Sequence, residues 1–425
     1  MPTIVVIGGG AAGFFAAIHA ALASPKAKVI LLEKTSKLLA KVRVSGGGRC
    51  NVTHHCFSIS EMSKKYPRGE KQMKQALHRF MTNDTIEWFE SRGVKLKAEN
   101  DGRMFPITDS SQTVIDCLMR ESQKLGIEIR LNCDVLQIIP ISLPTNPQIA
   151  FELLLKEQKK IACSKVIVAA GGSPKESGLT WLKDLGHEIQ TPVPSLFTFN
   201  IPNNPIIKLM GLSVPTARIK VQSSKLEAEG AVLVTHWGLS GPATLRLSAW
   251  GARDLAAMNY HFKISVNWLG GMKEEKLREL INASKNEFAG KLVSNCNVSA
   301  MLPLQTPPPT KSAAIPNRLW EFLIDKAEVP THKKWAELSK NELNKLINAT
   351  VNDEYEVKGK TTFKEEFVTC GGISLADIDL QTMQSNKVPH LYFAGEVLDI
   401  DGITGGFNFQ AAWTTGYIAG ISAAC

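Results

Sequence analysis

The opening of the chain alternates apolar runs with turns of small residues. The β-branched stretch Ile4–Ile7 leads directly into the glycine-rich stretch Gly8–Gly13, and the alanine-rich segment that follows is typical of a buried helix. A second apolar run, Val29–Leu32, ends at the acidic residue Glu33. Short apolar runs bounded by turn residues predict buried strands. The pattern therefore predicts a strand, a tight turn, a helix and a strand, which is how a Rossmann-like α/β domain begins.

Further periodic segments follow as far as residue 194. Apolar residues spaced three and four apart indicate helices, and alternation indicates strands. An apolar run that ends in small residues suits a buried parallel strand whose end meets a ligand. The predicted elements are helices at about 71–92 and 110–125, a turn at 100–106, a hairpin made of 127–138 and 149–155, and a strand at 165–172.

The pattern changes near residue 195. Up to about residue 270 the chain alternates like a set of strands, as in Ser213–Val221, and helical patterns follow at 242–257, 273–288, 317–328 and 339–350, with a proline-rich connector at Pro307–Pro309. Rossmann-like character returns near the end, where an apolar strand, His390–Glu396, precedes the glycine loop Gly402–Asn408 and a final helix rich in alanine and glycine. A nucleotide-binding domain that is split by an insertion explains this order.

We therefore predict an α/β fold in which one Rossmann-like domain is interrupted. Its first part covers 1–194 and its second part covers 366–425. The insertion covers 195–365, with a β-barrel at about 195–270 and a helical subdomain at about 271–350. At 425 residues the chain is too long for one ordinary core, which agrees with this division.

Composition narrows the functional classes. The chain is 44% hydrophobic and 21% charged, with a net charge of +9, and its basic residues cluster only modestly, as at 64–71 and 156–160. Scattered charge favours a solvated surface over a nucleic-acid stripe, so nucleic acid is an unlikely partner. Eight cysteines without a CxxC pair favour reduced thiols and a cytoplasmic location. Residues 4–23 lack a basic region before them, and no other stretch is long enough for a membrane span, so we expect neither a signal peptide nor a membrane partner.

The glycine turn has the chemistry of a dinucleotide site. In Gly8-x-Gly10-x-x-Gly13 the first glycine permits the turn, the second lets the backbone approach a pyrophosphate, and the third allows close packing of helix and strand. The helix N-terminus, with Ala11 and Ala12, offers free N–H groups to phosphate. Glu33 lies at the end of the second strand, where it can accept hydrogen bonds from ribose hydroxyls.

Two more glycine-bearing segments suggest a longer ligand. These are Ser45–Asn51 and Gly395–Gln410. A single pyrophosphate needs only the first turn, so three converging segments favour FAD over NAD. The N-terminus of the final helix, after Gly406, would stabilise negative charge on a reduced flavin ring. Small residues on that helix would allow it to pack closely; they are Ala411, Ala412, Gly416, Ala419 and Gly420.

The chain resembles the bacterial FAD-binding flavoproteins of the aminoacetone-oxidase-like or BaiN-like family, within the glutathione-reductase superfamily. The resemblance spans nearly the whole chain. It rests on Ser45–Thr53, Gly102–Pro106, Thr235–Pro242, Val368–Ile373 and Leu391–Gln410. It implies a glutathione-reductase-type FAD domain in two parts, interrupted by a β-barrel and a helical subdomain, and it implies FAD binding. It leaves the reaction open between oxidation of an amine or amino ketone and reduction of a conjugated double bond.

The motifs and the resemblance together predict a set of cofactor contacts. These are Gly8, Gly10, Ala11, Ala12, Gly13, Glu33, Lys34, Lys41, Ser45, Gly46, Gly47, Arg49, Cys50, Asn51, Val135, Ala170, Gly171, Gly395, Glu396, Asp401, Gly406, Asn408 and Gln410. One departure from the family pattern follows Gly171-Gly172. The family usually has a glycine-rich turn with an aspartate there, whereas 173–181 lacks the second glycine and the acid, so the residues that line this loop are not predicted.

Cys50 is the next question. A flavin disulfide reductase carries two cysteines five residues apart, but here His55 occupies that position and the next cysteine is Cys56. We therefore favour a structural Cys50 beside the cofactor. The chain also lacks a second GxGxxG, so NAD(P)H would be only a transient electron donor at the open flavin face. The sequence shows no second group of ligand residues that would complete a metal site with His54-His55-Cys56, and we therefore predict no metal site.

Two polar residues are candidates for catalysis. His236 has a side chain suited to proton transfer near neutral pH, and it precedes Ser240, which could cap a helix that begins near Pro242. Arg103 could bind an anionic or carbonyl group. A structural histidine and a packing arginine are equally good interpretations.

The predicted function is that of an FAD-dependent oxidoreductase. Its substrate would be a small organic molecule bound between domains, and the flavin would carry out hydride chemistry. Two alternatives stay open, a flavoprotein that acts on tRNA and a non-catalytic flavin redox sensor.

Overall fold

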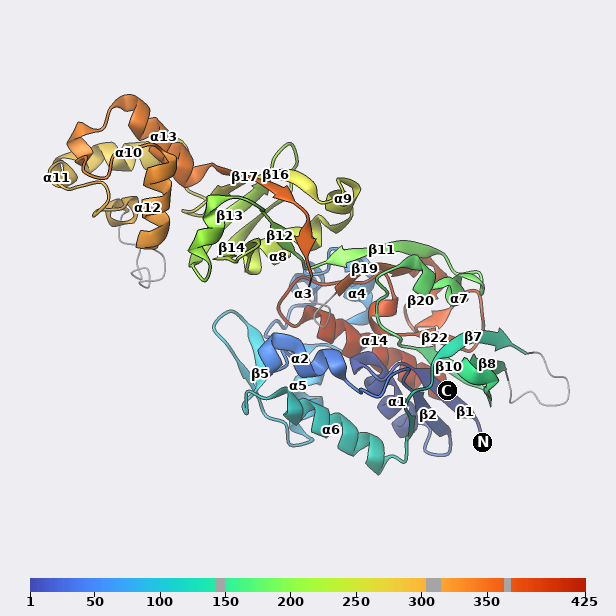
Figure 1. Ribbon diagram of the computed structural model, residues 1–425. Helices are drawn as coiled ribbons and strands as arrows, with labels where there is room; N and C mark the ends of the chain where they lie inside the picture. Colours follow the sequence, from blue (N-terminus) through green and yellow to red (C-terminus); the bar gives the residue numbers. More distant parts are fainter. Residues whose placement is uncertain (142–149, 303–314, 363–367) are drawn as a thin grey trace. The chain divides into compact units, whose positions relative to one another are not determined.

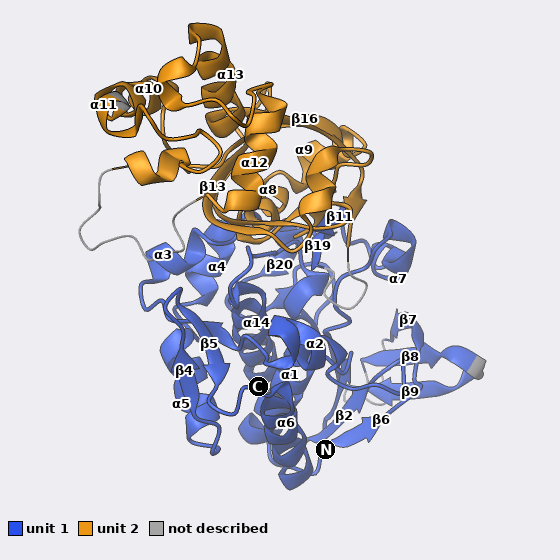
Figure 2. Cartoon of the chain, turned by 60° about the vertical axis from the view of Figure 1, so that its left-hand side comes forward, with its two compact units in different colours: residues 1–195, 363–425 blue, residues 196–362 orange. Residues whose placement is uncertain are grey.

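The computed structural model describes residues 1–141, 150–302, 315–362 and 368–425 (Figure 1). The chain forms two compact units, of which unit 1 comprises 1–195 with 363–425 and unit 2 comprises 196–362 (Figure 2). Pro307–Pro309, the predicted connector, lies outside the described residues.

Unit 1 is built on a mostly parallel sheet. The strand order is β20-β21-β22-β10-β1-β2-β6, and the five strands from β22 to β6 are parallel. This is the Rossmann order, and it reverses between β1 and β10, where such sheets bind their ligands. The bounds are β1 (Thr3–Ile7), β2 (Lys28–Leu32), β6 (Glu128–Arg130), β10 (Lys165–Val168), β20 (Ile378–Asp379), β21 (Gln384–Ser385) and β22 (Leu391–Phe393).

Within the residues that the structure describes, unit 1 also contains three smaller sheets and eight helices. The small sheets are β3 (Thr53–His54) with β4 (Leu96–Ala98) and β5 (Arg103–Pro106); β7 (Val135–Pro140) with β8 (Phe151–Leu155) and β9 (Lys160–Cys163); and β11 (Ile189–Ser195) with β19 (Val368–Ile373). The helices are α1 (Ala11–Ala23), α2 (Ala40–Gly48), α3 (Ile59–Ser63), α4 (Glu70–Ala76), α5 (Thr82–Glu90), α6 (Ser111–Lys124), α7 (Thr180–Lys183) and α14 (Phe407–Ala424).

The first and last helices of the chain lie side by side (Figure 1). A Cβ atom on Gly416 would come within 2.8 Å of the Ala12 carbonyl oxygen, and one on Gly420 would come within 2.4 Å of the Ala16 oxygen. Only glycine permits that approach, so α14 lies backbone to backbone on α1. The predicted packing of the small residues of the last helix is confirmed.

Unit 2 contains a seven-stranded antiparallel sheet and a group of helices. The sheet order is β17-β16-β13-β14-β15-β12-β18. Its strands are β12 (Thr198–Asn200), β13 (Ser213–Val221), β14 (Glu227–Val234), β15 (Gly238–Ser240), β16 (His261–Asn267), β17 (Asp353–Lys358) and β18 (Lys360–Thr361). The helices are α8 (Pro242–Trp250), α9 (Ala252–Ala257), α10 (Glu274–Ala283), α11 (Lys285–Phe288), α12 (Asn317–Lys326) and α13 (Lys340–Val351).

One stretch of chain joins the two ends of the unit 2 sheet. β17 pairs with β16, whereas β18 pairs with β12, and only Gly359 separates β17 from β18. Gly359 has a φ of +103°, which allows the strand to bend there. Asp353 fixes the helices to this sheet, because its buried carboxylate accepts from Trp268 Nε1 at 2.8 Å and pairs with Lys326 of α12.

Four predicted elements are divided in the structure. The helix predicted at 242–257 forms α8 and α9, and the helix predicted at 273–288 forms α10 and α11. The helix predicted at 71–92 is two helices, α4 and α5. The segment 127–138 is not one hairpin strand, because Asn132 takes a φ of +56° and ends the first strand. β6 therefore joins the parallel sheet, while β7 pairs with β8.

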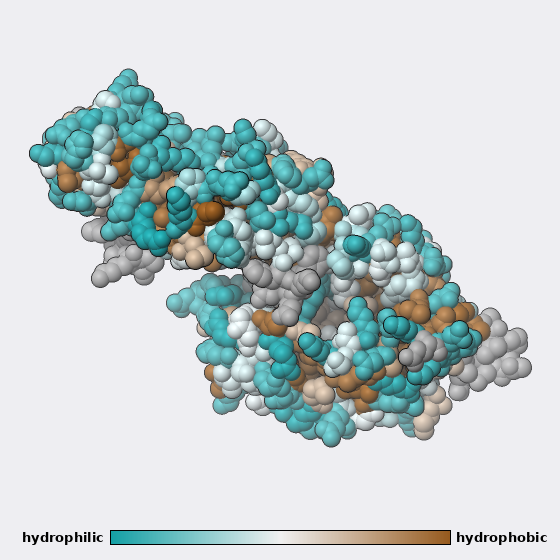
Figure 3. Space-filling model, viewed as in Figure 1, coloured by the Kyte–Doolittle hydropathy of each residue, from teal (hydrophilic) through white to brown (hydrophobic). Residues whose placement is uncertain are grey.

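The surface carries no extended apolar belt on the side shown. Hydrophobic residues form separate groups among hydrophilic ones in Figure 3. Within the described ranges, none of the helices combines the length and the apolar character that crossing a membrane requires.

An aromatic cluster between α1, α5 and α14 encloses His19. The imidazole lies 4.7 Å from the Phe15 ring and 4.8 Å from the Tyr417 ring, measured between centroids, and Nε2 has no hydrogen-bond partner among the described residues. Burial, reinforced by the charge of Arg92, lowers the pKa of His19 from 6.5 to about 3. His19 is therefore neutral in the folded protein.

Acidification is expected to destabilise unit 1 through His19. Between pH 6.5 and about pH 3 the unfolded chain binds a proton that the folded chain does not, so stability falls as pH falls. The shift corresponds to a loss of about 5 kcal/mol at pH 3. Denaturant unfolding of wild type and His19→Leu at pH 7, 6, 5 and 4 measures it, and the variant should lose less stability on acidification. The exposed His78→Gln should keep the wild-type dependence, and equal dependence in all three proteins would contradict the assignment.

Candidate functional site

The turn between β1 and α1 is shaped by the close approach of its own backbone. Gly8 has a φ of +115°, and a Cβ atom there would lie 2.2 Å from the Ala169 carbonyl oxygen. A Cβ atom on Gly13 would lie 1.9 Å from the Gly8 oxygen. Gly10 differs, because it has an extended backbone and, apart from its chain neighbours, no atom of the described residues lies within 4 Å of its Cβ position. The fold requires the first and third glycines, while the second borders open space.

The N-terminus of α1 faces that open space. Gly10 is the N-cap residue, so no side chain caps the helix, and the first turn contains no acidic residue. The N–H groups of Ala11, Ala12 and Gly13 precede the first bond within the helix, which Phe14 donates to the Gly10 oxygen at 3.0 Å. Free N–H groups at the positive end of a helix fit a pyrophosphate.

Glu33 is held at the end of β2 beside the same turn. Its Oε2 accepts from the Gly9 N–H at 2.8 Å, and its Oε1 accepts from the Thr35 N–H at 2.9 Å and from the Thr35 hydroxyl at 2.8 Å. The carboxylate is therefore oriented next to the phosphate-binding turn, where a ribose would follow. Lys34, its neighbour, is exposed.

The loop Ser45–Asn51 interrupts α2 and forms a second glycine-rich wall. Gly46, Gly47 and Gly48 all have positive φ angles of 59° to 84°. No protein atom lies within 4 Å of the Cβ positions of Gly47 and Gly48, so the loop is open on one side. The other side is attached to β5, where Asn51 Oδ1 accepts from the Met104 N–H at 3.2 Å.

Cys50 is fully buried at the end of this loop. Burial raises the pKa of its thiol to about 12, although a hydrogen bond with Ser45 opposes the shift. The thiol is therefore protonated at neutral pH and is not a nucleophile. The cysteines of the described residues are all free, which is consistent with the predicted structural role.

A group of ion pairs links the loop Ser45–Asn51 to the hairpin of β4 and β5. Glu99 pairs with Arg49 at 2.6 Å and with Arg103 at 2.9 Å, and Arg103 also pairs with Asp101 at 2.7 Å. The Arg49 guanidinium lies 4.0 Å from the centroid of Phe105. Arg103, one of the two predicted catalytic residues, thus forms ion pairs with two carboxylates of its own hairpin. The sequence reasoning missed Glu99, which joins the two arginines.

The third predicted segment brings two charged side chains together. Glu396 pairs through Oε2 with Lys41 Nζ at 2.6 Å, and its Oε1 accepts from the Thr369 N–H at 2.8 Å. A Cβ atom on Gly172 would lie 2.3 Å from Thr369 Oγ1, which is buried without a partner among the described residues. Three segments that are distant in sequence therefore meet beside the end of β10, at the point where the strand order reverses.

The neighbouring predicted contacts differ in burial. Ala170 is exposed, and the Cβ position of Gly171 is open. Val135 is buried in β7. Gly395 has a φ of +75°, and its N–H donates to Thr415 Oγ1 at 2.9 Å.

The N-terminus of α14 resembles that of α1. Its N-cap residue, Gly406, has a φ of +94° and makes no side-chain capping bond, and a Cβ atom there would lie 2.5 Å from the Thr53 carbonyl oxygen. Glycine is required because the turn touches the β3 backbone. His54 adds to this contact, because its Nδ1 lies 3.0 Å from the Gly405 oxygen and its ring stacks on Phe407 at 4.6 Å.

Two predicted cofactor residues on α14 bond to the protein instead. Asn408 exchanges two hydrogen bonds with Gly402, at 2.8 and 2.9 Å, which close the loop before the helix. Gln410 is fully buried, and its Oε1 accepts from the hydroxyls of Thr53 at 2.6 Å and Thr85 at 2.9 Å. The side chain of Asn408 closes the loop, and that of Gln410 joins α14 to β3 and α5. Contact of these two residues with the cofactor stays a prediction.

Asp401 is also turned into the protein. The carboxylate is fully buried, forms an ion pair with Arg68, and accepts from the Ser195 hydroxyl at 2.7 Å. Burial raises its pKa, against the opposing effect of Arg68. The sequence contains no local signal for Arg68, because the residue lies in a basic run 333 positions from its partner.

His236 lies in unit 2. The side chain is exposed, and its ring contacts Trp237 edge to face at 4.4 Å. Pro242 begins α8 as predicted, but the N-cap residue is Gly241. The predicted Ser240 cap is wrong, because this residue ends β15 and offers its carbonyl oxygen to Thr244 at 3.1 Å. Catalysis by His236 stays a prediction.

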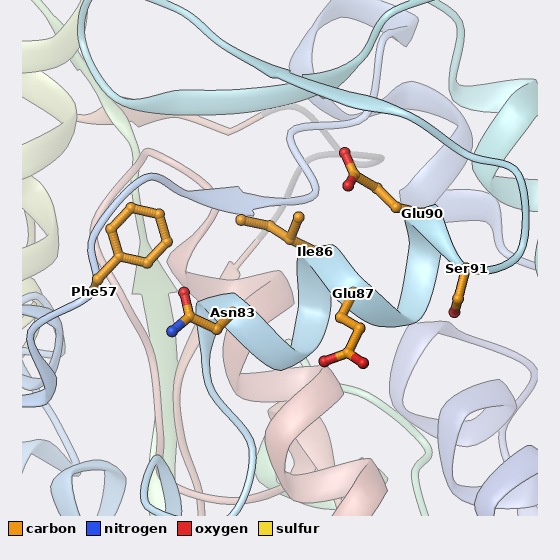
Figure 4. Close-up of a pocket in the computed structure, with 6 residues that line it drawn as sticks. All are labelled: Phe57, Asn83, Ile86, Glu87, Glu90 and Ser91. Carbon is orange, nitrogen blue, oxygen red and sulfur yellow. The ribbon is translucent and has the colours of Figure 1, made fainter.

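Two further features carry no obvious chemistry. A shallow depression of about 400 Å³ follows α5, lined by Phe57, Asn83, Ile86, Glu87, Glu90 and Ser91. Its carboxylates point to different sides of the helix and form no shared site (Figure 4). Across the described ranges, no group of three or more His, Cys, Asp or Glu side chains is placed to hold a metal ion.

Comparison with known proteins supports the assignment of the fold. The family model described as the HI0933-like protein Rossmann domain matches residues 2–422. A solved 3-ketosteroid-Δ4-(5α)-dehydrogenase from Rhodococcus jostii shares the fold, with a TM-score of 0.52, 14% identity, and coverage of 99% of this chain and 96% of that one.

Curated relatives match from end to end. A 3-dehydro-bile acid Δ(4,6)-reductase from Clostridium scindens is 26% identical over 100% of this chain and 99% of its own length. Ribosomal RNA dihydrouridine synthases are 27% identical, one from Escherichia coli over 97% of this chain and 96% of its own length, and one from Haemophilus influenzae over 98% and 97%.

Proposed function

Because the chain belongs to the family of HI0933-like Rossmann proteins, we propose that it reduces a carbon–carbon double bond conjugated with a carbonyl group. The protein is an FAD-dependent oxidoreductase. The proposal concerns the bond on which the protein acts. It favours double-bond reduction over the oxidation of an amine or amino ketone, which the sequence analysis left open.

The names of the curated relatives carry the proposal. A 3-dehydro-bile acid Δ(4,6)-reductase acts on double bonds in line with a 3-oxo group. A dihydrouridine synthase saturates the uracil C5–C6 bond, which is conjugated with the C4 carbonyl. Both names describe a net gain of two hydrogen atoms by a conjugated double bond, which a hydride and a proton can supply. One flavin site therefore suits both substrate classes.

The residues of unit 1 fit FAD. Gly10 leaves room beside the free N–H groups of α1 for the pyrophosphate, and Glu33 is oriented for the adenosine ribose. When bound and reduced by the electron donor, the flavin would supply the hydride. The turn at Gly406 would place a second free helix N-terminus against the flavin ring, where it stabilises negative charge. NAD(P)H is the proposed electron donor.

Anaerobic reduction followed by mixing with substrate tests this function. Holoenzyme reduced with NADPH, NADH or dithionite is mixed, without oxygen, with a 3-oxo-Δ4,6 steroid acid or with unmodified ribosomal RNA. The expected result is return of the oxidised flavin absorbance together with a product that has gained two hydrogen atoms. Aminoacetone serves as the contrast. Reduction of the oxidised enzyme by aminoacetone, with reoxidation by oxygen alone, would contradict the proposal.

A further inference from the structure

The densest concentration of basic residues lies on α3, α4 and the segments around them. Six of the sixteen residues from Lys64 to Arg79 are lysine or arginine, and only Glu70 is acidic. Two of the six have partners, since Lys64 pairs with Glu61 at 2.7 Å and Arg68 pairs with buried Asp401. The remaining four define the basic α4 surface: Lys65, Lys71, Lys74 and Arg79.

These four side chains form no ion pair with a described acid. Elsewhere in unit 1 some surface cations are neutralised, as Lys124 is by Glu121 at 2.9 Å and Arg130 is by Glu128 at 2.6 Å. Other exposed lysines, such as Lys34, form no ion pair with a described acid, but they do not lie in so dense a basic run. Lys71, Lys74 and Arg79 are exposed, and Arg79 makes one hydrogen bond, to the Gln381 carbonyl oxygen at 3.3 Å. Their charge is therefore available to an external anion.

The fold fixes the direction in which these cations point. Met73, Ala76 and Leu77 are at most 1% exposed and anchor one side of α4. Lys71 and Lys74, three residues apart, consequently share the opposite side. The chain continues to turn after α4, because the Arg79 N–H donates to the Ala76 oxygen at 2.9 Å. The backbone that carries these cations is therefore anchored to the fold.

This face is attached directly to the loop that precedes α14. The Ile403 N–H donates to the Lys65 oxygen at 2.9 Å, and the Tyr66 hydroxyl donates to the Phe407 oxygen at 2.8 Å. A Cβ atom on Gly69 would lie 2.8 Å from Ile400 Cγ1, which shows how closely the two segments approach. The segment that carries the basic α4 surface is thus bonded to the loop that precedes the helix N-terminus assigned to the flavin ring.

We propose that the basic α4 surface binds the phosphate backbone of a structured RNA and so presents a uracil base to the flavin. This inference rests on the proposed function, and it names RNA as the substrate. It revises the expectation from composition, because four cations of one basic run form no ion pair with a described acid. Phosphate contacts of this kind supply affinity and position, while base contacts supply specificity.

A membrane is a poorer fit for the same surface. Helices that lie on membranes bury an apolar face in the lipid. Here the apolar face of α4 is already buried in the protein, and none of the large hydrophobic side chains found exposed falls between residues 64 and 79. The basic α4 surface therefore fits a polymer with repeated anionic groups, which binds without an apolar contact.

RNA binding by the oxidised holoenzyme over a salt series tests the inference. Each phosphate contact contributes about 0.7–0.9 to the slope of log K against log salt. The triple variant Lys71→Gln/Lys74→Gln/Arg79→Gln is therefore expected to lower the slope by about 2–3 and to weaken binding of a ribosomal RNA fragment at least about tenfold at low salt. Unchanged FAD content and thermal unfolding show that the variant is folded.

A matched triple variant in unit 2 provides the control. Lys220→Gln/Lys225→Gln/Lys263→Gln removes the same charge from exposed positions and should keep both the slope and the affinity. Equal losses in the two variants, or no loss in the first, would overturn the inference. So would binding of wild type to anionic phospholipid vesicles or to polyglutamate with greater affinity than to RNA. Because the assay measures binding by the oxidised enzyme, its result is independent of whether the double-bond reduction is observed.

Discussion

Replacing Gly10 with alanine is expected to remove FAD while leaving the fold intact. Gly10 has a φ of −92°, which alanine adopts easily, and the added methyl group would meet no protein atom within 4 Å. The apoprotein should unfold at the wild-type temperature or slightly above it, because alanine restricts the unfolded chain. The methyl group would, however, occupy the space assigned to the pyrophosphate. We expect affinity for FAD to fall at least about a hundredfold, or ~2.7 kcal/mol.

Flavin titration of the apoprotein and thermal unfolding measure the two effects separately. Gly13→Ala is the comparison, because its Cβ atom would lie 1.9 Å from the Gly8 oxygen and must disturb the fold itself. That variant should lose FAD and stability together. Wild-type FAD affinity in Gly10→Ala would show that the open space beside α1 is not the pyrophosphate site.

Breaking the buried ion pair between Arg68 and Asp401 is expected to produce the largest loss of stability. Arg68→Met would leave the carboxylate fully buried with only the Ser195 hydroxyl as a partner. Loss of one partner of a buried pair costs about 3–5 kcal/mol. FAD should also be lost more readily, because Asp401 begins the loop that leads to α14.

The pH dependence of that defect distinguishes an unpaired charge from a packing fault. Burial already raises the pKa of Asp401, and removal of Arg68 raises it further, so the folded variant binds a proton more readily than the unfolded chain. The deficit should therefore shrink as pH falls. Denaturant unfolding from pH 8 to pH 5 measures it. Lys97→Met breaks the exposed pair with Asp109 and should cost far less than Arg68→Met at every pH. A deficit in Arg68→Met that does not change with pH would contradict this account.

The parallel strands and the first turn could be predicted because their signals are local. The apolar run Ile4–Ile7 is buried, and Gly13 is required by a contact with Gly8 within the same strand–turn–helix unit. Gly8 is required by Ala169 at the end of β10, a distant contact that its place in the glycine motif predicts. The return of the chain to this domain was visible for the same reason, because an apolar strand and a glycine turn precede α14.

The roles of individual polar residues were harder to predict. Thr53 meets Gln410 across 357 positions, and Arg49 meets Glu99 across 50. A single sequence contains no sign of which charge or amide will meet which, since each residue type suits several partners. Asn408 and Gln410 were therefore assigned to the cofactor, although their side chains bond to the loop, to β3 and to α5.

The ends of the inserted unit lie next to each other in the hydrogen-bonding pattern. Thr198 pairs with Thr361 within unit 2, and Ser195 pairs with Val368 within unit 1. A segment that leaves and re-enters its host through neighbouring strands can be lengthened, exchanged or deleted in evolution without re-threading the host. The host domain can thus keep its threading while the insertion changes in length or sequence.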